Sequence, residues 1–179
     1  MFFSMADAAG KFTAAVVTVS DSCARGERED GSGPAVAHLL EKLHFSVTAR
    51  EIVPDETIQI QNVLIRLARE VRLIVTTGGT GIAPRDVTPE ATAAVCERIL
   101  DGVAECMRAE GSKKTAFAAL SRGICGVRGN ALILNLPGSP AGAIESLQAV
   151  AGLIPHAIEL LSGNTAHPDL PSNRVSTGD

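Results

Sequence analysis

The order of the apolar segments constrains the fold of this chain more than any other feature. Short runs rich in β-branched residues occupy residues 12–20, 46–53 and 73–77. Between them, residues 36–43 and 60–71 carry apolar side chains that recur every three or four positions. The runs are typical of buried strands and the recurring stripes of amphipathic helices. This alternation predicts right-handed βαβ units and a parallel sheet.

The second half of the chain departs from this rhythm. Two short apolar runs, residues 121–127 and 131–136, are separated by a turn-forming Arg-Gly-Asn sequence, which predicts an antiparallel hairpin. A helix capped by Thr88 with Pro89 at its first position, a second helix over about 103–110 and a final helix kinked at Pro155 are also expected. We therefore predict an α/β fold of three layers, a mostly parallel mixed sheet with helices on both faces.

The composition agrees with such a core. The chain has no Trp or Tyr and only five Phe, although hydrophobic residues make up 45% of it. Val, Ile, Leu and Ala must then fill the interior, as is usual for a parallel sheet covered by helices. A length of 179 residues suits one domain. We expect a flexible leader over 1–11, a single α/β domain over 12–163 and a flexible tail over 164–179.

Charge and cysteine content exclude several classes of protein. The net charge of −4 argues against a nucleic-acid binder with a broad basic face. No apolar run approaches the ~18 residues of a membrane span, and the first residues lack the basic start of a secretory signal. The four cysteines form no C-x-x-C pair, which favours reduced thiols. We expect a soluble cytoplasmic protein.

Four loops follow predicted strands, and all four are rich in small, polar or acidic residues. They span residues 21–34, 54–55, 78–88 and 135–140. In an open α/β sheet, ligands bind beyond the carboxyl ends of the strands, where loops lead into helices. The four loops therefore predict one shared ligand site.

The most informative loop lies in the sequence TTGGTGIAPRDVTPEA, residues 76–91. Its three closely spaced glycines allow backbone N–H groups to approach an anion, and Arg85 is a phosphate donor. The adjacent Asp86 would repel phosphates unless Mg²⁺ lay between them. Neither a Walker loop nor a G-x-G-x-x-G sequence is present. The loop predicts metal-assisted phosphoryl or nucleotidyl transfer.

Each of these signals also has an ordinary structural explanation. A glycine-rich loop can be a simple strand-to-helix turn, and Asp55 and Asp86 can be helix-capping acids. Arg122 can be a solvated surface residue, and Lys113 and Lys114 a surface pair. No single signal decides the function, so the combination carries the argument.

The combination resembles the molybdopterin adenylyltransferase family of molybdenum cofactor biosynthesis, of the MogA and MoaB type. The resemblance covers residues 18–161 through six ordered motifs. They are TVSDS at 18–22, DGSGP at 30–34, VPDE at 53–56, TTGGTG followed by PRDVTPEA at 76–91, LSRGICGVRG at 120–129 and NLPGSP at 135–140.

The resemblance implies the fold of this family and a Mg²⁺-dependent reaction, in which molybdopterin and ATP give adenylyl-molybdopterin and pyrophosphate. It implies that Asp55 and Asp86 are the catalytic acids and the metal ligands. The residues implied to bind substrate are Ser20, Asp21, Ser32, Gly33, Pro34, Gly78, Gly79, Thr80, Gly81, Arg85, Ser121, Arg122, Asn135, Pro137, Gly138 and Pro140.

The resemblance also implies a homotrimer that passes its product to a molybdenum insertase. Two other functions stay open on the sequence. The chain could be a non-catalytic molybdopterin carrier of the MoaB type, or a molybdenum-insertion domain. Two acids beside a phosphate loop favour catalysis, because a carrier has no evident need for them.

Overall fold

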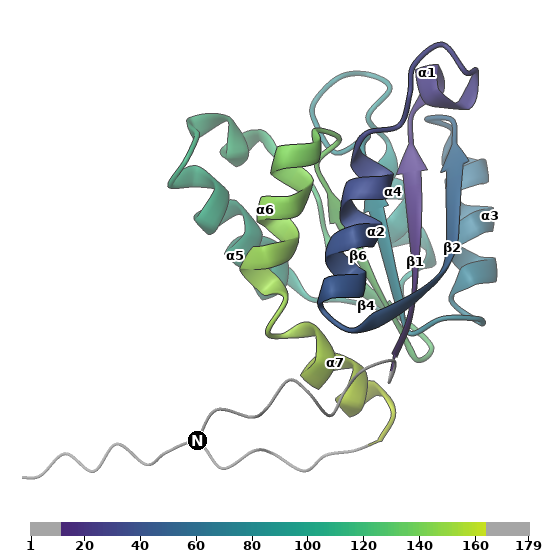
Figure 1. The fold of residues 1–179 in the computed structure, drawn as a ribbon, viewed down its shortest axis with the longest axis vertical. Coiled ribbons are helices and arrows are strands. Elements are labelled where there is room, and N and C mark those ends of the chain that lie inside the picture. The colour runs from purple at the N-terminus through teal and green to yellow at the C-terminus, as the bar shows by residue number, and fades with distance from the viewer. Residues whose placement is uncertain (1–11, 164–179) are drawn as a thin grey trace, which may run out of the picture.

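The computed structural model describes residues 12–163, and its centre is a six-stranded sheet (Figure 1). The leader and tail expected from the sequence lie outside the described residues. The strand order is β2-β1-β3-β6-β5-β4. The strands are β1 (Phe12–Val19), β2 (Phe45–Val53), β3 (Leu73–Thr77), β4 (Arg98–Ile99), β5 (Cys125–Arg128) and β6 (Ala131–Leu136).

The sheet is mixed, as the sequence predicts. Strands β2, β1, β3 and β6 run parallel, whereas β5 pairs antiparallel with both β6 and β4. The β5–β6 hairpin therefore confirms the predicted departure from the parallel rhythm. The two-residue strand β4 was not expected, because so short a segment has no readable period.

Helices cover both faces of the sheet, which confirms the three layers. Figure 1 shows α2 and α6 in front of the strands and α3 on the opposite side. The helical elements are α1 (Asp21–Ala24), α2 (Ser32–Lys42), α3 (Thr57–Leu67), α4 (Thr88–Val95), α5 (Asp101–Ser112), the 3₁₀ helix η2 (Ala116–Leu120), α6 (Pro140–Val150) and α7 (Ile154–Leu161).

Two aliphatic cores result, one on each face of the sheet. Alternate residues of β1 point to opposite faces, so Val16 packs with α2 and α6 while Val17 packs with α3 and α4. Leu40 and Leu147 are fully buried in the first core, and Leu64 is fully buried in the second. The apolar stripes predicted over residues 36–43 and 60–71 are the faces of α2 and α3 that pack against the sheet.

Two helical predictions need correction, and one further helical element was not expected. The loop after β1 was expected to be irregular but contains the short helix α1. The segment before Ser121 contains η2, which has no buried residue and therefore no apolar stripe to read. The final helix was expected to kink at Pro155. It is instead interrupted, and α7 starts at Ile154 with Pro155 in its first turn, a position where proline needs no hydrogen-bond acceptor.

The register of the parallel strands brings their carboxyl ends together. Thr18 of β1 pairs with Thr77 of β3, and Thr77 pairs with Leu136 of β6. The loops that follow these strands therefore emerge side by side at one edge. Across residues 12–163 no individual helix has the length and apolarity to cross a membrane; α6 and α7 pass that test only as a pair, and they are bent by 62°.

Candidate functional site

The glycine turn after β3 is the centre of this edge. Gly78 donates its N–H to Leu136 O at 3.1 Å, which fixes the start of the turn against β6. Gly78 and Gly79 have φ angles of 92° and 62°, in the left-handed region. A Cβ on Gly78 would lie 2.3 Å from Val19 O, so only glycine fits there.

Asp55 and Asp86 both lie against this turn. A Cβ on Gly79 would be 3.1 Å from Asp55 Oδ1, and one on Gly81 would be 2.7 Å from Asp86 Oδ2. Asp86 Oδ2 accepts a hydrogen bond from Ala83 N at 2.8 Å. The sequence placed the two acids on separate loops, and the fold brings both to the same four-residue turn.

Asp55 does not cap α3, contrary to one expectation from the sequence. Glu56 occupies the N-cap position, and no side chain caps that helix. Instead Asp55 Oδ2 accepts from Asp21 N at 2.8 Å, and Asp55 N donates to Asp21 Oδ1 at 3.1 Å. The reciprocal pair ties the loop after β2 to the loop after β1, so the carboxylate serves the site and not the helix.

Thr88 likewise is not a helix cap. It is the first residue of α4, and its hydroxyl donates to Gly78 O at 2.9 Å. Its N–H donates to Gly79 O at 3.1 Å. Thr88 therefore links the start of α4 to the glycine turn. Both hydrogen bonds span the loop between Gly79 and Thr88.

The acids form a cluster with little positive charge at its centre. Burial raises the pKa of Asp55, and the nearby carboxylates of Asp21 and Asp86 raise it further, against the opposing hydrogen bond from Asp21 N–H. Desolvation by itself would raise the pKa of Asp21. Hydrogen bonds from Arg85 and from Asp55 N–H outweigh this effect, so the pKa of Asp21 is lowered. The two linked acids therefore shift in opposite directions, with the pKa of Asp55 raised and that of Asp21 lowered.

Arg85 faces the acids. Its Nε and Nη2 donate to the Asp21 carboxylate, each at 3.0 Å, and Nη2 also donates to Glu56 Oε1 at 2.9 Å. These two carboxylates, Glu56 first, raise the pKa of Arg85. The side chain is largely exposed, so it can exchange these partners for a phosphate.

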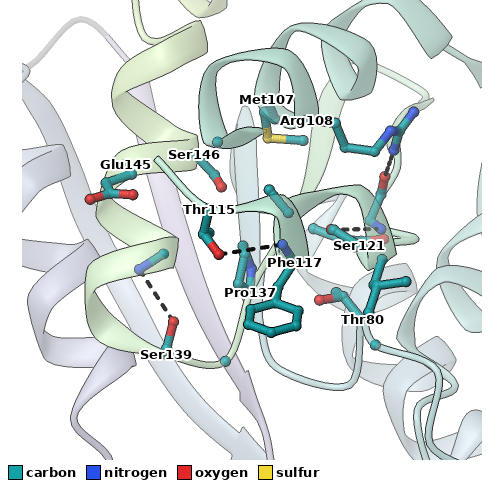
Figure 2. A pocket seen from close by; sticks show the side chains of 18 of the residues that line it. Thr80, Met107, Arg108, Thr115, Phe117, Ser121, Pro137, Ser139, Glu145 and Ser146 are labelled. Carbon is teal, nitrogen blue, oxygen red and sulfur yellow. Dashed lines mark hydrogen bonds between the residues drawn. The ribbon is translucent and has the colours of Figure 1, made fainter. Parts of the chain in front are cut away.

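A pocket of about 380 Å³ adjoins the glycine turn, because Thr80 and Gly81 line it (Figure 2). It is bounded by α5, η2 and α6 and by the loops that follow β3 and β6. The lining residues are Thr80, Gly81, Ala104, Met107, Arg108, Gly111, Thr115, Phe117, Ala118, Leu120, Ser121, Gly123, Asn135, Pro137, Gly138, Ser139, Gly142, Glu145 and Ser146. Figure 2 shows the Phe117 ring beside Pro137, with Thr80 and Ser121 nearby.

The family follows from comparison with known proteins. A family model described as "Probable molybdopterin binding domain" matches residues 15–156, most of the chain. The chain belongs to this molybdenum cofactor biosynthesis family. The resemblance stated from the six sequence motifs is therefore confirmed.

Individual relatives agree with the family assignment. A Helicobacter pylori protein named molybdopterin adenylyltransferase is 44% identical over 156 residues, which are 83% of this chain and 87% of that protein. The Drosophila melanogaster molybdenum cofactor synthesis protein cinnamon is 43% identical over 157 residues. That match covers 86% of this chain but only 26% of cinnamon.

Solved structures share the fold. The structure titled molybdopterin biosynthesis enzyme MoaB from Thermus thermophilus has a TM-score of 0.81 and 52% identity to this chain. The match covers 85% of this chain and 97% of that one. The predicted three-layer α/β fold of the family is thus confirmed.

Within this family fold, the predicted substrate-binding residues fall into several groups. Six of them line the pocket: Thr80, Gly81, Ser121, Asn135, Pro137 and Gly138. Gly78, Gly79, Asp21 and Arg85 belong to the turn and its acid cluster. Arg122 binds the glycine loop: its guanidinium donates hydrogen bonds to the carbonyls of Gly81 and Asp86.

Asn135 has a structural role as well as a place in the pocket wall. Its side chain is buried, and Nδ2 donates to Thr76 Oγ1 at 3.0 Å and to Thr92 Oγ1 at 2.9 Å. Its Oδ1 accepts from Ile124 N at 3.4 Å. The amide therefore joins β3, α4 and the start of β5 directly beneath the pocket.

The remaining predicted residues lie outside the pocket. Ser20 is the N-cap of α1, and its Oγ accepts from Cys23 N at 3.3 Å. Pro34 borders a different groove between α2 and β2, and Pro140 is the first residue of α6. Ser32 and Gly33 begin α2 and are buried.

Ser32 and Gly33 belong to a hydrogen-bond chain that sequence reasoning missed. Asp30 Oδ1 accepts from Ser32 N at 3.1 Å and from Gly33 N at 2.9 Å, while its Oδ2 accepts from Thr18 Oγ1 at 2.7 Å. Ser32 Oγ lies 2.9 Å from Thr77 Oγ1. The chain joins β1, α2 and β3. The available signal was an acid two residues before Ser32, the usual place for a carboxylate that binds the free N–H groups of a helix start.

Sequence reasoning also missed the apolar wall of the pocket. Met107 on α5 and Phe117 on η2 lie on segments to which no function was given. Phe117 is 80% exposed although it is one of only five phenylalanines in the chain. The exposure of this aromatic side chain is the feature that marks the wall, and it can be recognised only from the structure.

The paired lysines are ion-paired on the surface. Lys113 Nζ lies 2.5 Å from Glu110 Oε1, and Lys114 Nζ lies 2.9 Å from Glu145 Oε1. Glu145 borders the pocket, so Lys114 joins the end of α5 to α6 at the rim. Both side chains are exposed, which agrees with the surface pair that the sequence offered as one explanation.

Proposed function

We propose that this chain transfers AMP from ATP to the phosphate of molybdopterin, with release of pyrophosphate. One observation carries the proposal: the glycine turn lies against the carboxylates of Asp55 and Asp86, and two of its residues, Thr80 and Gly81, also line a pocket of about 380 Å³. Adenylyl transfer between two phosphorylated molecules needs both parts next to each other. The names of the Helicobacter pylori and other relatives point to the same activity.

Side chains and backbone groups of this chain position the two substrates. Backbone N–H groups of the turn and Arg85 are the donors for phosphate oxygens. The pocket between α5, η2 and α6 holds a flat ring system against Met107 and Phe117. The phosphate of molybdopterin then attacks the α-phosphorus of ATP, and pyrophosphate leaves in line. Fixing both substrates in this geometry removes most of the entropic barrier.

The acid cluster fits Mg²⁺, the proposed cofactor. Within residues 12–163, Asp55 Oδ1 and Asp86 Oδ1 accept no hydrogen bond. Burial raises the pKa of Asp55, and the carboxylates of Asp21 and Asp86 add to this effect. In the same part of the chain no three His, Cys, Asp or Glu side chains are grouped to hold a metal by themselves. Mg²⁺ prefers one or two carboxylates together with substrate phosphates, and bound there it would neutralise charge on the triphosphate.

The test is pyrophosphate release from ATP that requires both molybdopterin and Mg²⁺. The substitution Asp86→Asn should lower kcat by about 10²-fold or more, because it removes an electrostatic stabiliser while keeping the acceptor for Ala83 N–H. Glu110→Gln, an exposed acid of α5 outside the site, is the matched control and should retain turnover. Near-normal kcat in the Asp86→Asn protein would contradict the assigned role.

The same assay decides between this proposal and a carrier function. A non-catalytic carrier would bind molybdopterin, detected by its pterin fluorescence, without releasing pyrophosphate. An insertion domain would respond to molybdate and not to ATP. The acid cluster favours catalysis, because it repels a phosphorylated ligand unless a cation is bound.

Assembly and location stay predictions. We infer a homotrimer, which light scattering on the purified chain tests directly. The match covers 26% of cinnamon, and another relative is named a molybdenum cofactor biosynthesis bifunctional protein; both support a proposed hand-over to a molybdenum insertase. A cytoplasmic location is inferred from the reduced cysteines and is tested by fractionation of the host cell.

A further inference from the structure

Arg122 contacts the glycine loop at several points. It lies between η2 and β5, and its N–H donates to Thr80 O at 2.9 Å. Its Nε donates to Gly81 O at 2.6 Å and its Nη2 to Asp86 O at 2.6 Å. Its Nη1 pairs with Glu90 in the first turn of α4. One residue therefore binds the carbonyls at both ends of the segment 81–86.

That segment has few other attachments. Residues 82–85 are exposed, so no buried side chain anchors them. Inside the loop, Asp86 N donates to Ala83 O at 2.9 Å, and Asp86 Oδ2 accepts from Ala83 N at 2.8 Å. These internal bonds shape the loop but do not attach it to the sheet. Arg85 attaches the segment to the loops after β1 and β2 through exposed ion pairs with Asp21 and Glu56. Arg122 differs from these side-chain pairs because its guanidinium binds the backbone of the segment at both ends, at Gly81 O and Asp86 O.

The geometry requires a planar, forked donor. Nε and Nη2 lie on one edge of the guanidinium and reach two carbonyl oxygens at once. A lysine ammonium is a single point of charge on a flexible stem and cannot hold both carbonyls in a fixed geometry. Arg122 differs from Arg85 in its partners: two of its side-chain bonds go to backbone carbonyls, whereas those of Arg85 go to the carboxylates of Asp21 and Glu56.

We propose that Arg122 is a positioning residue for Asp86: its guanidinium bridges Gly81 O and Asp86 O and sets the place of the Asp86 carboxylate beside the turn. The role of Asp86 in catalysis rests on the proposed function. The bridging itself does not, and it can be measured on the protein without substrates.

The substitution Arg122→Lys tests the bridge, with Arg128→Lys as the matched control. Arg128 also donates to a backbone carbonyl, Val95 O at 2.7 Å, but it does so at the start of the β5–β6 turn, away from the site. Glu90→Gln is a second control, because it removes only the exposed ion pair of Arg122. Thermal melts and circular dichroism compare the folding of all the variants.

The first readout is hydrogen exchange without ligands. In Arg122→Lys, amide exchange over residues 81–86 should be about tenfold faster or more, because the segment opens locally without the bridge. The strands β1 and β3 should keep their protection, and both controls should match the parent protein at 81–86. If Arg122→Lys does not fold, Arg122→Gln, which keeps one amide donor, replaces it in the same measurement.

The second readout is kinetic. The Mg²⁺ concentration for half-maximal pyrophosphate release should rise about tenfold and kcat should fall about tenfold, while KM for molybdopterin changes less than about threefold. Unchanged exchange at 81–86 would overturn the proposal. So would a raised KM for molybdopterin or ATP with an unaltered loop, the result expected of a direct phosphate contact. If no variant, the parent included, releases pyrophosphate, the proposed function fails, and the exchange data still decide the bridge.

Discussion

At the scale of single residues, the site is organised by carboxylates in unequal surroundings. Asp21 is paired with Arg85, whereas Asp55 is partly buried and faces two other acids. The Mg²⁺ site proposed above would account for this repulsion, because an acid that binds a cation is short of positive partners before the cation arrives. The sequence identified the residues of this cluster, but the reciprocal Asp21–Asp55 bonds depend on the pairing of β1 with β2.

Asp55→Asn should raise the melting temperature at pH 7, by a few degrees at most because water screens a partly exposed group. The folded-state pKa of Asp55 is raised above its ordinary value of 3.8, so the folded protein binds more protons than the unfolded chain between these values. The stability of the folded state therefore falls as pH rises through this window. At pH 7 the destabilisation by the charged Asp55 carboxylate is fully present.

Calorimetry at two pH values measures this effect. The advantage of Asp55→Asn should disappear below the ordinary pKa, where the carboxyl is protonated in both states. Added Mg²⁺ should stabilise the parent protein and not the variant. A variant that melts below the parent at pH 7 would show that the surroundings of Asp55 stabilise its charged form, the opposite of the expected sign.

At the scale of elements, the starts of the helices decide how the loops are held. Helix α2 begins at Ser32 with its first N–H groups bound by Asp30, whereas α3 and α5 have no side-chain cap. The sequence predicted most elements because aliphatic stripes and β-branched runs report burial directly. It missed η2 and β4, which bury no side chain and carry no such period.

Asp30→Ala should lower the free energy of unfolding by about 1–3 kcal/mol, because the N–H groups of Ser32 and Gly33 and the Thr18 hydroxyl lose their acceptor. Asp101→Ala is the matched control. Asp101 also lies in the first turn of a helix but makes no cap, so its loss should cost less than about 0.5 kcal/mol. Urea titrations of both variants check the difference; equal values would show that the Asp30 bonds add nothing.

At the scale of the whole molecule, two cores enclose the sheet and the site is confined to one edge. The cores are aliphatic and close-packed, and Cys125 is completely buried in the first of them. Burial raises the pKa of Cys96 to about 11 and that of Cys125 to about 12. Cys106 on α5 is exposed. The thiols therefore report whether the native packing is intact.

An aromatic disulfide reagent at pH 7.5 should modify Cys106 quickly and the other cysteines slowly. A pKa raised by two or more lowers the thiolate fraction of Cys96 and Cys125 by about 100-fold or more, and burial slows access further. Mass spectrometry of the modified peptides measures each rate, and all four thiols should react in denaturant. Rapid labelling of Cys125 in the native protein would contradict the closed core.

The sequence by itself determined the layered α/β fold, the mixed sheet and the loops that bear function, because burial periodicity and glycine-rich turns are local properties of the chain. Only the tertiary structure decided which loop residues meet. Asp55 became a partner of Asp21 instead of a helix cap, and Arg122 became a contact of the glycine loop instead of a solvated side chain. The pocket wall of Met107 and Phe117 likewise arises where α5 packs against η2 and α6. Such contacts join residues far apart in sequence, and strand order and register fix them, which no local pattern encodes.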